Sequence, residues 1–429
     1  MLLVIIVAPL LLFPGGWRTW GLLLPIILLA GNRLFTRRWL TRTPYDLAIL
    51  VLLAMVLVSL YATFSISFSL PKIAGVVLGV TLLYASVGFL TEERRFRWGV
   101  AGVSLGITGF AAVALFGSKW GTKLPIVREI AAQLPRLIEG LPGAESGFHP
   151  AEVGGTLCWI LFIPAAVAIG LLKMPTSPWR KLLAIPLALL SALLAAMLIL
   201  TTSRSAWIGV GVATAIALAL ISRWSRALVA GGLVALVIVA FWLRPVDFST
   251  ILGDESPVDL GTVTNINIEG RIEIWSRAIY GIQDFPFTGM GMGTFRKVVH
   301  ILYPLFLVPP EQDLGHAHNE ALQAALDLGI PGLIAFLALQ ILAIAAAYLA
   351  WRHGRDPLIR WASLGTLAGL IAHDVYGLTD AVALGAKPGA FWWLLLALGA
   401  AAWQLTVRES EADTNADHMG MQRLSRSRG

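Results

Sequence analysis

Three residues in this sequence have the chemistry to grip a phosphate or to move a proton: Arg204, Arg271 and His318. An arginine guanidinium is permanently charged, and its paired N–H donors match the oxygens of a phosphate group. A histidine titrates near neutral pH, so it can take a proton from a hydroxyl group that attacks an electrophile. Together these residue types predict a binding site for a phosphorylated substrate that also contains a general base.

Arg204 belongs to a short polar segment, residues 202–207, which interrupts an apolar run from 182 to 221. Two membrane spans fit in that run, so the polar segment should form a tight hairpin between them. Arg204 and the preceding Ser203 would then start the second helix, where backbone N–H groups and the helix dipole favour an anion. The alternative is an arginine that only reaches toward the membrane surface from the end of a span.

Arg271 shares one face of a predicted helix with Trp275, Ala278 and Ile282. A charged side chain on an apolar face costs free energy unless an anion meets it. The alternative is a salt bridge to one of the nearby carboxylates. On another face, Glu273 and Arg277 should form an i,i+4 ion pair, and the helix should end at Phe285 and Pro286.

His318 lies in the segment His316-Ala317-His318-Asn319-Glu320. We expect it at the edge of a short helix over about 319–328, which Gly329 stops before the next span begins at Pro331. Asn319 could orient the imidazole or bind substrate, whereas an N-cap or a structural hydrogen bond is the alternative for His318. His316 adds only a weak metal-binding pattern with no visible third ligand, so neither a metal nor another cofactor is predicted.

Further ionisable groups lie near the expected outer ends of spans. Lys72 could add positive charge to the phosphate site, and His373, Asp374 and Asp380 lie together at the end of a later span. Ionisable groups at membrane depth indicate function by default, although a His/Asp pair that packs the bundle is the alternative. The Gly-x-Gly-x-Gly turn at 289–293 lacks the strand and helix of a nucleotide fingerprint, so we attribute loop flexibility to it.

Composition identifies the scaffold that must position these residues. The chain is 57% hydrophobic and only 13% charged, with a mean hydropathy of +0.77, which excludes an ordinary soluble protein. Its net charge of +7 comes from basic residues dispersed between apolar spans, a pattern of membrane topology rather than of nucleic-acid binding. Cys158 is the single cysteine, so no internal disulfide can form. We predict an all-α polytopic membrane protein.

Spans of about 20 apolar residues cross a bilayer, and about twelve such segments can be placed. Residues 1–243 would hold nine spans and an outer loop at 117–152 with a short helix around 126–139. Residues 244–329 would form an acidic outer insert, 330–407 the last three spans, and 408–429 a disordered tail. The expected spans are 2–15, 19–31, 45–64, 70–90, 98–116, 153–172, 181–200, 205–221, 227–243, 331–351, 358–377 and 388–406; the first two ranges could instead form one span.

The distribution of lysine and arginine sets the orientation of this arrangement. Most basic residues fall in the connections on the side of the N-terminus, and few fall in the short connections on the other side. Both chain ends are therefore expected in the cytoplasm and the insert outside.

The motifs resemble those of the O-antigen ligase and polymerase superfamily over roughly residues 200–335. The matching residues are Ser203-Arg204-Ser205-Ala206-Trp207; Gly270-Arg271 leading to Trp275, Pro286, Gly289 and Gly291; and His318-Asn319 leading to Leu322-Gln323 and Leu328-Gly329-Ile330-Pro331-Gly332. The resemblance implies a GT-C-like fold, arginines (Arg204 and Arg271) that grip a lipid-linked diphosphate, an essential histidine (His318) and no metal. The chain departs from the family at His149-Pro150-Ala151, where members often have His-Pro-Asn.

The hypothesis that follows is glycosyl transfer on the periplasmic side of a bacterial inner membrane. The donor would be a glycan on undecaprenyl diphosphate, and the acceptor lipid A-core, so that the product belongs to lipopolysaccharide synthesis. The alternatives are a polymerase that uses a second lipid-linked repeat, a protein-glycosylating relative, a small-anion transporter and an assembly protein. Candidate residues at the outer face favour an enzyme, whereas paired charges at mid-span would favour transport. The insert would act as a lid that brings Arg271 and His318 to Arg204.

Overall fold

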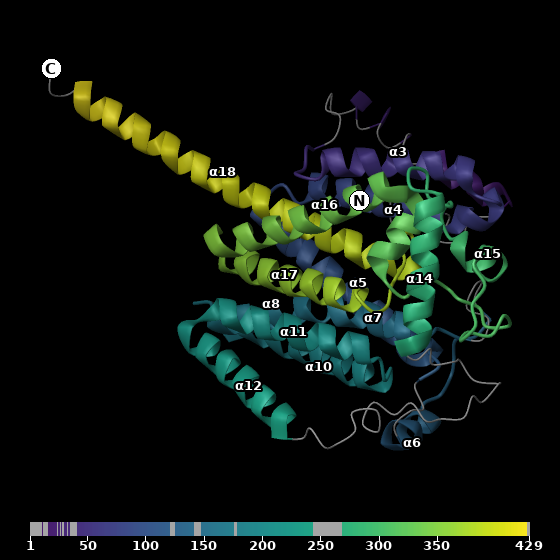
Figure 1. Ribbon diagram of the computed structural model, residues 1–429. Coiled ribbons are helices and arrows are strands. Elements are labelled where there is room, and N and C mark those ends of the chain that lie inside the picture. Colours follow the sequence, from purple (N-terminus) through teal and green to yellow (C-terminus); the bar gives the residue numbers. More distant parts are fainter. Residues whose placement is uncertain are drawn as a thin grey trace.

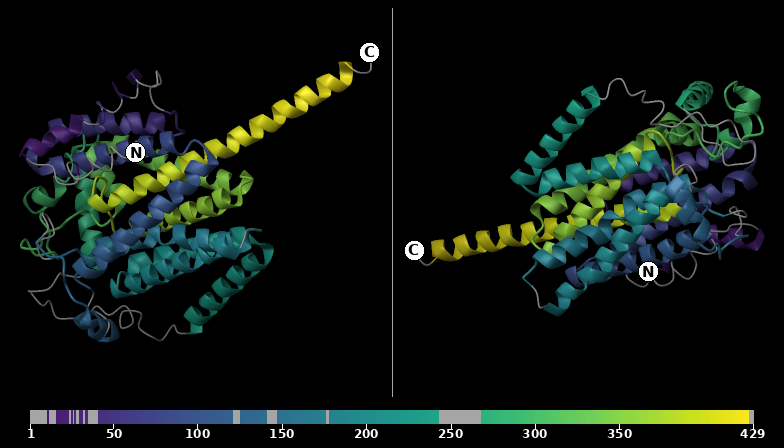
Figure 2. Two further views of the ribbon diagram at one scale, coloured as in Figure 1. Left: turned by 180° about the vertical axis from the view of Figure 1, so that it is seen from behind. Right: turned by 90° about the horizontal axis from the view of Figure 1, so that it is seen from below.

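The protein is an all-helical bundle in the part of the chain that this computed structural model describes, namely residues 11, 16–23, 25, 27, 30, 31, 33, 34, 41–120, 125–140, 147–175, 178–242 and 268–426. Its long helices run side by side, and α14 lies across their ends (Figures 1 and 2). The helices are η1 (Gly16–Leu23), α3 (Asp46–Ala62), α4 (Ile66–Phe89), α5 (Glu93–Gly117), α6 (Pro125–Gln133), α7 (Pro150–Ile160), α8 (Phe162–Lys173), α9 (Pro178–Leu182), α10 (Ala184–Leu200), α11 (Arg204–Ile221), α12 (Arg223–Trp242), α14 (Ile268–Asp284), α15 (Phe295–Leu302), α16 (Glu320–His353), α17 (Pro357–Gly377), η2 (Lys387–Gly389) and α18 (Ala390–Arg426).

Among the described residues, 6 helical segments are long and apolar enough to cross a membrane, and α3 and α10 are shorter apolar helices. These segments indicate a membrane protein. Each of them overlaps a range expected from the sequence. Of the expected span 2–15 the structure describes residue 11 alone, whereas of 19–31 it describes residues 19–23, which lie in η1, and residues 25, 27, 30 and 31. The 6 segments are Ile66–Phe89, Glu93–Gly117, Pro150–Lys173, Arg204–Ile221, Glu320–His353 and Lys387–Glu411.

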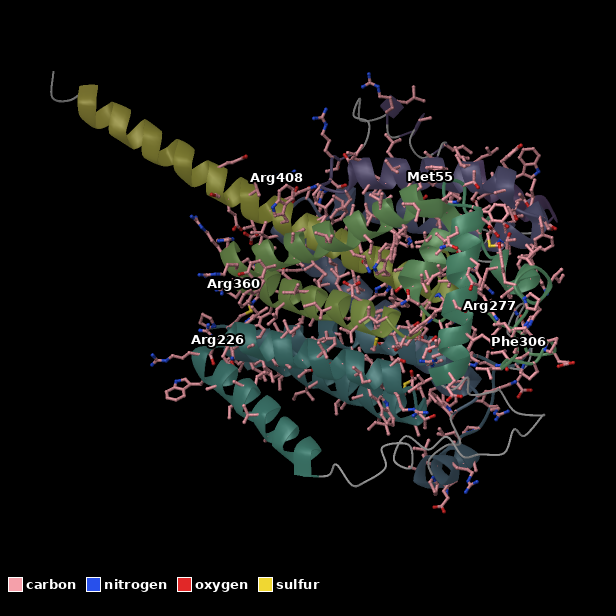
Figure 3. The ribbon with its side chains drawn as sticks, in the orientation of Figure 1. Met55, Arg226, Arg277, Phe306, Arg360 and Arg408 are labelled. Atoms are coloured by element: carbon pink, nitrogen blue, oxygen red, sulfur yellow. The ribbon has the colours of Figure 1, made fainter. Side chains whose placement is uncertain are left out.

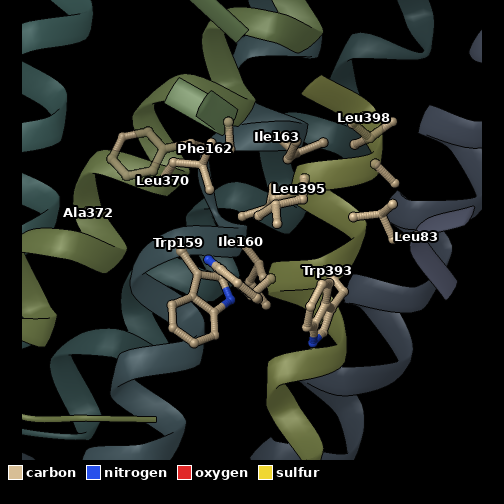
Figure 4. Packing of buried hydrophobic residues seen from close by; sticks show 14 of the residues in the cluster. Leu83, Trp159, Ile160, Phe162, Ile163, Leu370, Ala372, Trp393, Leu395 and Leu398 are labelled. Carbon is tan, nitrogen blue, oxygen red and sulfur yellow. The ribbon is translucent and has the colours of Figure 1, made fainter. Parts of the chain in front are cut away.

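The core is built around α17, which packs against α7, α8, α11, α16 and α18. Close helix approach explains the small residues on its neighbours: a Cβ on Gly209 of α11 would lie 2.8 Å from the Ala372 carbonyl oxygen. Large side chains fill the remaining space, and Trp159 and Trp393 are fully buried. Figure 4 shows part of this packing, with Leu83, Trp159, Ile160, Phe162, Ile163, Leu370, Ala372, Trp393, Leu395 and Leu398 labelled.

The break at Gly329 confirms the expected short helix before the following span. Helix α16 is non-helical at Gly329 (φ 70°, ψ 179°), a left-handed φ that glycine adopts without steric cost. The backbone N–H of the next residue, Ile330, donates to the carbonyl oxygen of Pro286 instead (2.7 Å). The first part of α16 is thereby joined to the segment that follows α14.

Three expectations need correction. The glycine turn at 289–293 is a packed element rather than a flexible one, because its close contacts leave no room for side chains: a Cβ on Gly289 would lie 2.6 Å from the Gly329 nitrogen, and one on Gly291 2.6 Å from Thr63. The segment after 407 is helical rather than disordered, since α18 continues to Arg426 and projects beyond the bundle (Figure 1). Its Ala, Glu, Met, Gln and Arg residues favour helix, and no proline interrupts them. In the outer loop, α6 is shorter than the helix expected at 126–139.

Candidate functional site

His318 occupies a strained position between the insert and α16. Its φ of 49° lies in the left-handed region, which L-residues seldom adopt and which recurs at functional sites. Its carbonyl oxygen accepts a hydrogen bond from Trp275 Nε1 of α14 (3.2 Å), and its N–H donates to His316 Nδ1 (3.1 Å). The backbone of His318 is therefore held from two sides.

The imidazole of His318 meets a carboxylate that is distant in sequence. His318 Nδ1 lies 3.2 Å from Asp380 Oδ1, in the turn after α17. Burial acts to raise the pKa of Asp380, but the hydrogen bond from His318 and the electrostatic influence of His316, His318 and Arg271 outweigh it and hold that pKa below its usual range. Because an ionised carboxylate only accepts, His318 Nδ1 carries the hydrogen and Nε2 keeps its lone pair. The pair therefore presents a base.

His316 is a neutral neighbour of this pair. Burial lowers its pKa to about 3, and the adjacent His318 adds to the effect. Its Nδ1 accepts from the His318 backbone, so Nε2 carries the hydrogen and faces Asp380 Oδ1 at 3.7 Å. The two imidazole rings meet edge to face, with centroids 4.6 Å apart.

Asp380 is also the third potential metal ligand that the sequence did not reveal. The ligand atoms of His316, His318 and Asp380 all lie within 4.8 Å of one another, which corrects the interpretation that nothing accompanies the two histidines. Such a donor set suits zinc. However, the positive charges of Arg271 and Lys72 act on the same groups and oppose a cation. The electrostatics of the site suit an anion better.

Arg204 lies where the polar break in the apolar run predicts it. Helix α10 ends at Leu200, Thr202 adopts a φ of 51° in the hairpin, and α11 begins at Arg204 with Ser203 as its N-cap residue. The tight hairpin is thus confirmed. Arg204 is half-buried in the first turn of this helix.

Consecutive residues after α17 join the arginine hairpin to the histidine. The Thr379 hydroxyl donates to Ser205 Oγ in α11 (2.8 Å), one residue before Asp380. Asn319, the N-cap of α16, accepts from the Leu322 N–H (2.9 Å) and donates through Nδ2 to the Leu378 carbonyl oxygen (3.0 Å). The first turns of α11 and α16 are therefore connected through one short turn, which brings Arg204, His318 and Asp380 into one region.

Arg271 approaches the same region from α14. Its Nε is buried and donates to no acceptor in the described part of the chain, while its positive charge acts on Asp380. A buried N–H without a partner is uncommon and costs free energy unless a ligand satisfies it. The predicted ion pair on the other face is present, with Arg277 Nη2 3.5 Å from Glu273 Oε1.

Lys72 is balanced by a carboxylate that the sequence did not single out. Its Nζ lies 3.9 Å from Oδ2 of Asp327, which is fully buried. Asp327 Oδ1 accepts from the Gly293 N–H (2.8 Å) and from Gln323 Nε2 (2.9 Å). Lys72 is still close enough to lower the pKa of His316. Its Nζ is buried and makes no hydrogen bond within the described residues, so the Asp327 carboxylate balances its charge only through this ion pair.

His373 lies apart from this group, buried between α16 and α17. Its Nε2 lies 3.2 Å from Glu320 Oε1, and its Nδ1 lies 3.4 Å from Asp374 Oδ1. The sequence predicts a His/Asp pair here but does not identify Glu320. In the sequence, the position of Glu320 next to Asn319 is the one feature that could have indicated Glu320 as the partner of His373. His149 caps α7 by accepting from the Ala151 N–H (3.2 Å).

Comparison with known protein families supports the resemblance. Residues 189–337, about a third of the chain, match the family model described as O-antigen ligase. The matched range includes Arg204, Arg271, His318 and Asn319, and excludes Asp380. No curated protein matches the chain.

Proposed function

We propose that this chain belongs to the O-antigen ligase and polymerase superfamily, whose family model matches about a third of it, and that it transfers a glycan from undecaprenyl diphosphate to a sugar hydroxyl on an acceptor. The observation that carries the proposal is that a basic nitrogen, on His318, and a group that can bind an anion, on Arg271, both lie near Asp380. His318 Nε2 is left with a lone pair by the Asp380 contact, and the unpartnered Arg271 Nε lies on the same side of the molecule.

The reaction then follows from the roles of these groups. The acceptor hydroxyl gives its proton to His318 Nε2 while its oxygen bonds to the anomeric carbon of the donor sugar. The bond from that carbon to the diphosphate oxygen breaks, and undecaprenyl diphosphate leaves. Arg204 and Arg271 balance the negative charge that develops on the leaving group, and the positive charge of Lys72 supports them. Direct displacement of this kind inverts the anomeric configuration.

Positive side chains perform the charge balance that a metal ion performs in many phosphate-handling enzymes. We therefore expect activity without a divalent cation. Removing metals with a chelator should leave the rate unchanged, and a rate restored only by zinc after chelation would show instead that His316, His318 and Asp380 hold a catalytic ion.

The arrangement in the membrane is part of the proposal. We place the chain in the bacterial inner membrane with about twelve spans in a GT-C-like arrangement, both ends in the cytoplasm and the insert 244–329 in the periplasm. Arg226, Arg360 and Arg408 gather at the end of the bundle opposite α14, as the positive-inside rule requires of the cytoplasmic end (Figure 3).

The acceptor decides between a ligase and a polymerase. We favour lipid A-core, with a second lipid-linked repeat as the alternative, because the matched family is described as O-antigen ligase. Purified protein should be incubated with lipid-linked glycan and either acceptor, and the products separated by size. Product with lipid A-core alone supports the ligase, and product with the lipid-linked repeat alone supports the polymerase. An absence of product with both acceptors, from protein that binds the donor, would reject glycosyl transfer.

The arginines have their own test. Arg204→Gln and Arg271→Gln should each weaken donor binding by about tenfold or more, because a charge-assisted hydrogen bond contributes about 1.5–3 kcal/mol. Arg277→Gln is the matched control on α14, since its side chain pairs with Glu273 instead. Unchanged affinity in the first two variants would remove these residues from the diphosphate site.

Transport of a small anion is disfavoured by where the buried charges lie. The His373–Glu320 pair joins the first residue of α16 to the last turns of α17, at the end of the bundle that carries α14, rather than at mid-span. Vesicles that contain the purified protein should show no counterflow of phosphate or of other small anions.

A further inference from the structure

Helix α15 and the loop after it present a cluster of exposed apolar side chains. Ile301 is 76% exposed and Phe306 84% exposed, and Leu302 and Leu307 are each more than half exposed. Large apolar side chains that are exposed close together in the chain indicate an interaction site. We refer to these four side chains as the α15 patch.

The patch is held in a fixed shape by α14. The Glu273 carboxylate accepts the backbone N–H groups of Phe306 (2.7 Å) and Leu307 (2.8 Å), and Arg277 Nε donates to the Pro304 carbonyl oxygen (2.8 Å). The Arg277 guanidinium also lies over the Phe306 ring, 5.7 Å from its centroid. Figure 3 shows both residues at the α14 end of the molecule. These contacts therefore keep the side chains of the α15 patch exposed instead of burying them.

Contacts at the other end of α15 place the patch beside the bilayer. Thr294, the N-cap of α15, is hydrogen-bonded to Thr63 in the turn between α3 and α4 (3.1 Å). Helix α4 is one of the membrane-spanning candidates, so this turn lies where the chain leaves the hydrocarbon. Helix α15 is therefore fixed at the level of the membrane surface.

The face of α15 toward α4 has the character of a membrane interface. Lys297 Nζ lies over the ring of Phe68, 5.4 Å from its centroid, and Phe68 packs against Phe64. Ile301 follows Lys297 by one helical turn, so both residues lie on this face. A basic residue beside aromatic and aliphatic side chains is typical of elements that lie in the headgroup region.

We propose that the α15 patch docks on the outer-leaflet surface of the bilayer, beside α3 and α4. Ile301, Leu302, Phe306 and Leu307 enter the boundary between headgroups and acyl chains, and Lys297 meets lipid phosphates. Docking of the α15 patch fixes the insert against the membrane, so that Gly293 and Lys72 stay at the depth where a lipid headgroup begins. The proposal depends on the membrane-spanning helices and not on glycosyl transfer.

A spin-label experiment tests directly whether the α15 patch docks on the bilayer. Cys158 is the single cysteine and is buried, so a Cys158→Ser background accepts single labelling sites. Ile301→Cys and Phe306→Cys would carry a nitroxide, with Glu311→Cys, an exposed charged position further along the loop, as the matched control. The full chain is placed in nanodiscs of phosphatidylethanolamine and phosphatidylglycerol, and the collision of each label with oxygen and with a water-soluble nickel chelate is measured.

The two arms of the measurement give opposite expected results. Labels at 301 and 306 should collide preferentially with oxygen, which concentrates in the bilayer, and the label at 311 with the nickel chelate. Equal nickel collision at all three positions would overturn the proposal. Spin–spin broadening at 306 that disappears when labelled protein is diluted with unlabelled protein would also overturn it, because the patch would then contact a second copy of the chain.

Discussion

Two histidine–carboxylate pairs join α16 to α17, and their chemistry is nearly the same. His318 Nδ1 lies 3.2 Å from Asp380, and His373 Nε2 lies 3.2 Å from Glu320. They differ in access, since the His318 side chain is 18% exposed and that of His373 only 2%. The first pair leaves one ring nitrogen open toward the site, whereas both nitrogens of His373 face protein groups. Under the proposed function, access to the imidazole rather than its pairing with a carboxylate would distinguish the reactive His318 from the positioning His373.

The buried pair is built into a tightly packed junction. His373 Nδ1 faces Gln340 Nε2 (2.9 Å), and its ring lies tilted against that of Trp159, with centroids 4.5 Å apart. The Glu320 side chain passes close to the backbone at position 377, where a Cβ in place of the glycine hydrogen would lie 2.7 Å from Glu320 Oε2. Glu320 directly follows His318 and Asn319 in the chain. We therefore expect the buried pair to position the exposed pair.

The largest effect should come from His318→Ala. Removing the base should lower kcat by about 10²–10⁴-fold, the usual contribution of general base catalysis, and leave donor affinity unchanged because Arg204 and Arg271 remain. Rates would be measured by product formation from lipid-linked glycan. His300→Ala is the control, because that imidazole lies 3.1 Å from the Gln312 carbonyl oxygen in the loop after α15 instead of pairing with Asp380. Full activity in the His318 variant would contradict the base assignment.

Asp380→Asn should have the next largest effect. An asparagine amide that donates to Nδ1 would leave the hydrogen on Nε2, so His318 could no longer accept the proton of the acceptor hydroxyl. We expect kcat to fall by about 10²–10³-fold, in the lower part of the range for general base catalysis and less than on loss of the base itself. The double variant with His318→Ala should be no slower than His318→Ala alone, because the two residues act as a unit. Additive losses would mean that Asp380 acts separately, for example on the diphosphate site.

The contrast between the pairs also shows what the sequence could and could not predict. The hairpin before Arg204, the apolar face of α14 and the break at Gly329 were predictable, since lengths of apolar runs and the positions of glycine and proline are local signals. The approach of Asp380 to His318 spans 62 positions and depends on how α17 packs on α16. The partners Glu320 and Asp327, and helix α15, were missed for the same reason. Carboxylates near helix ends are common, and the packing of the helices determines which of them pairs with a given histidine or lysine.

Breaking the buried pair should affect the reaction less than either change at the exposed pair. Glu320→Ala and His373→Ala should each lower kcat by about tenfold through displacement of His318, with the KM for the donor unchanged. Loss of one partner of a buried pair costs about 3–5 kcal/mol, so a lower Tm should accompany the effect. Glu320→Gln, which retains the size of the side chain, should restore part of kcat. The double variant should be no worse than either single variant.

A matched control separates positioning from general loosening of α17. Thr366 is fully buried on α17 and bonds only to its own helix, through the Ala362 carbonyl oxygen. Thr366→Val should leave kcat unchanged. In a Thr366→Val background, Glu320→Gln should still have a higher kcat than Glu320→Ala. If Thr366→Val lowered kcat as much as Glu320→Ala, the buried pair would be a packing element without a specific relation to His318.

The smallest effect should come from Trp275→Phe. This substitution tests whether the contact from α14 helps to position His318. The substitution keeps an aromatic ring on α14 and removes the hydrogen bond from Trp275 Nε1 to the His318 carbonyl oxygen (3.2 Å). A single hydrogen bond contributes about 1 kcal/mol, so kcat should fall by about fivefold with little change in donor affinity. Trp224→Phe on the exposed surface of α12 is the control, since Trp224 is 72% exposed. If Trp275→Phe instead abolished activity while Glu320→Ala had no effect, α14 rather than the α16–α17 junction would position the histidine, and the roles assigned to the two pairs would have to be revised.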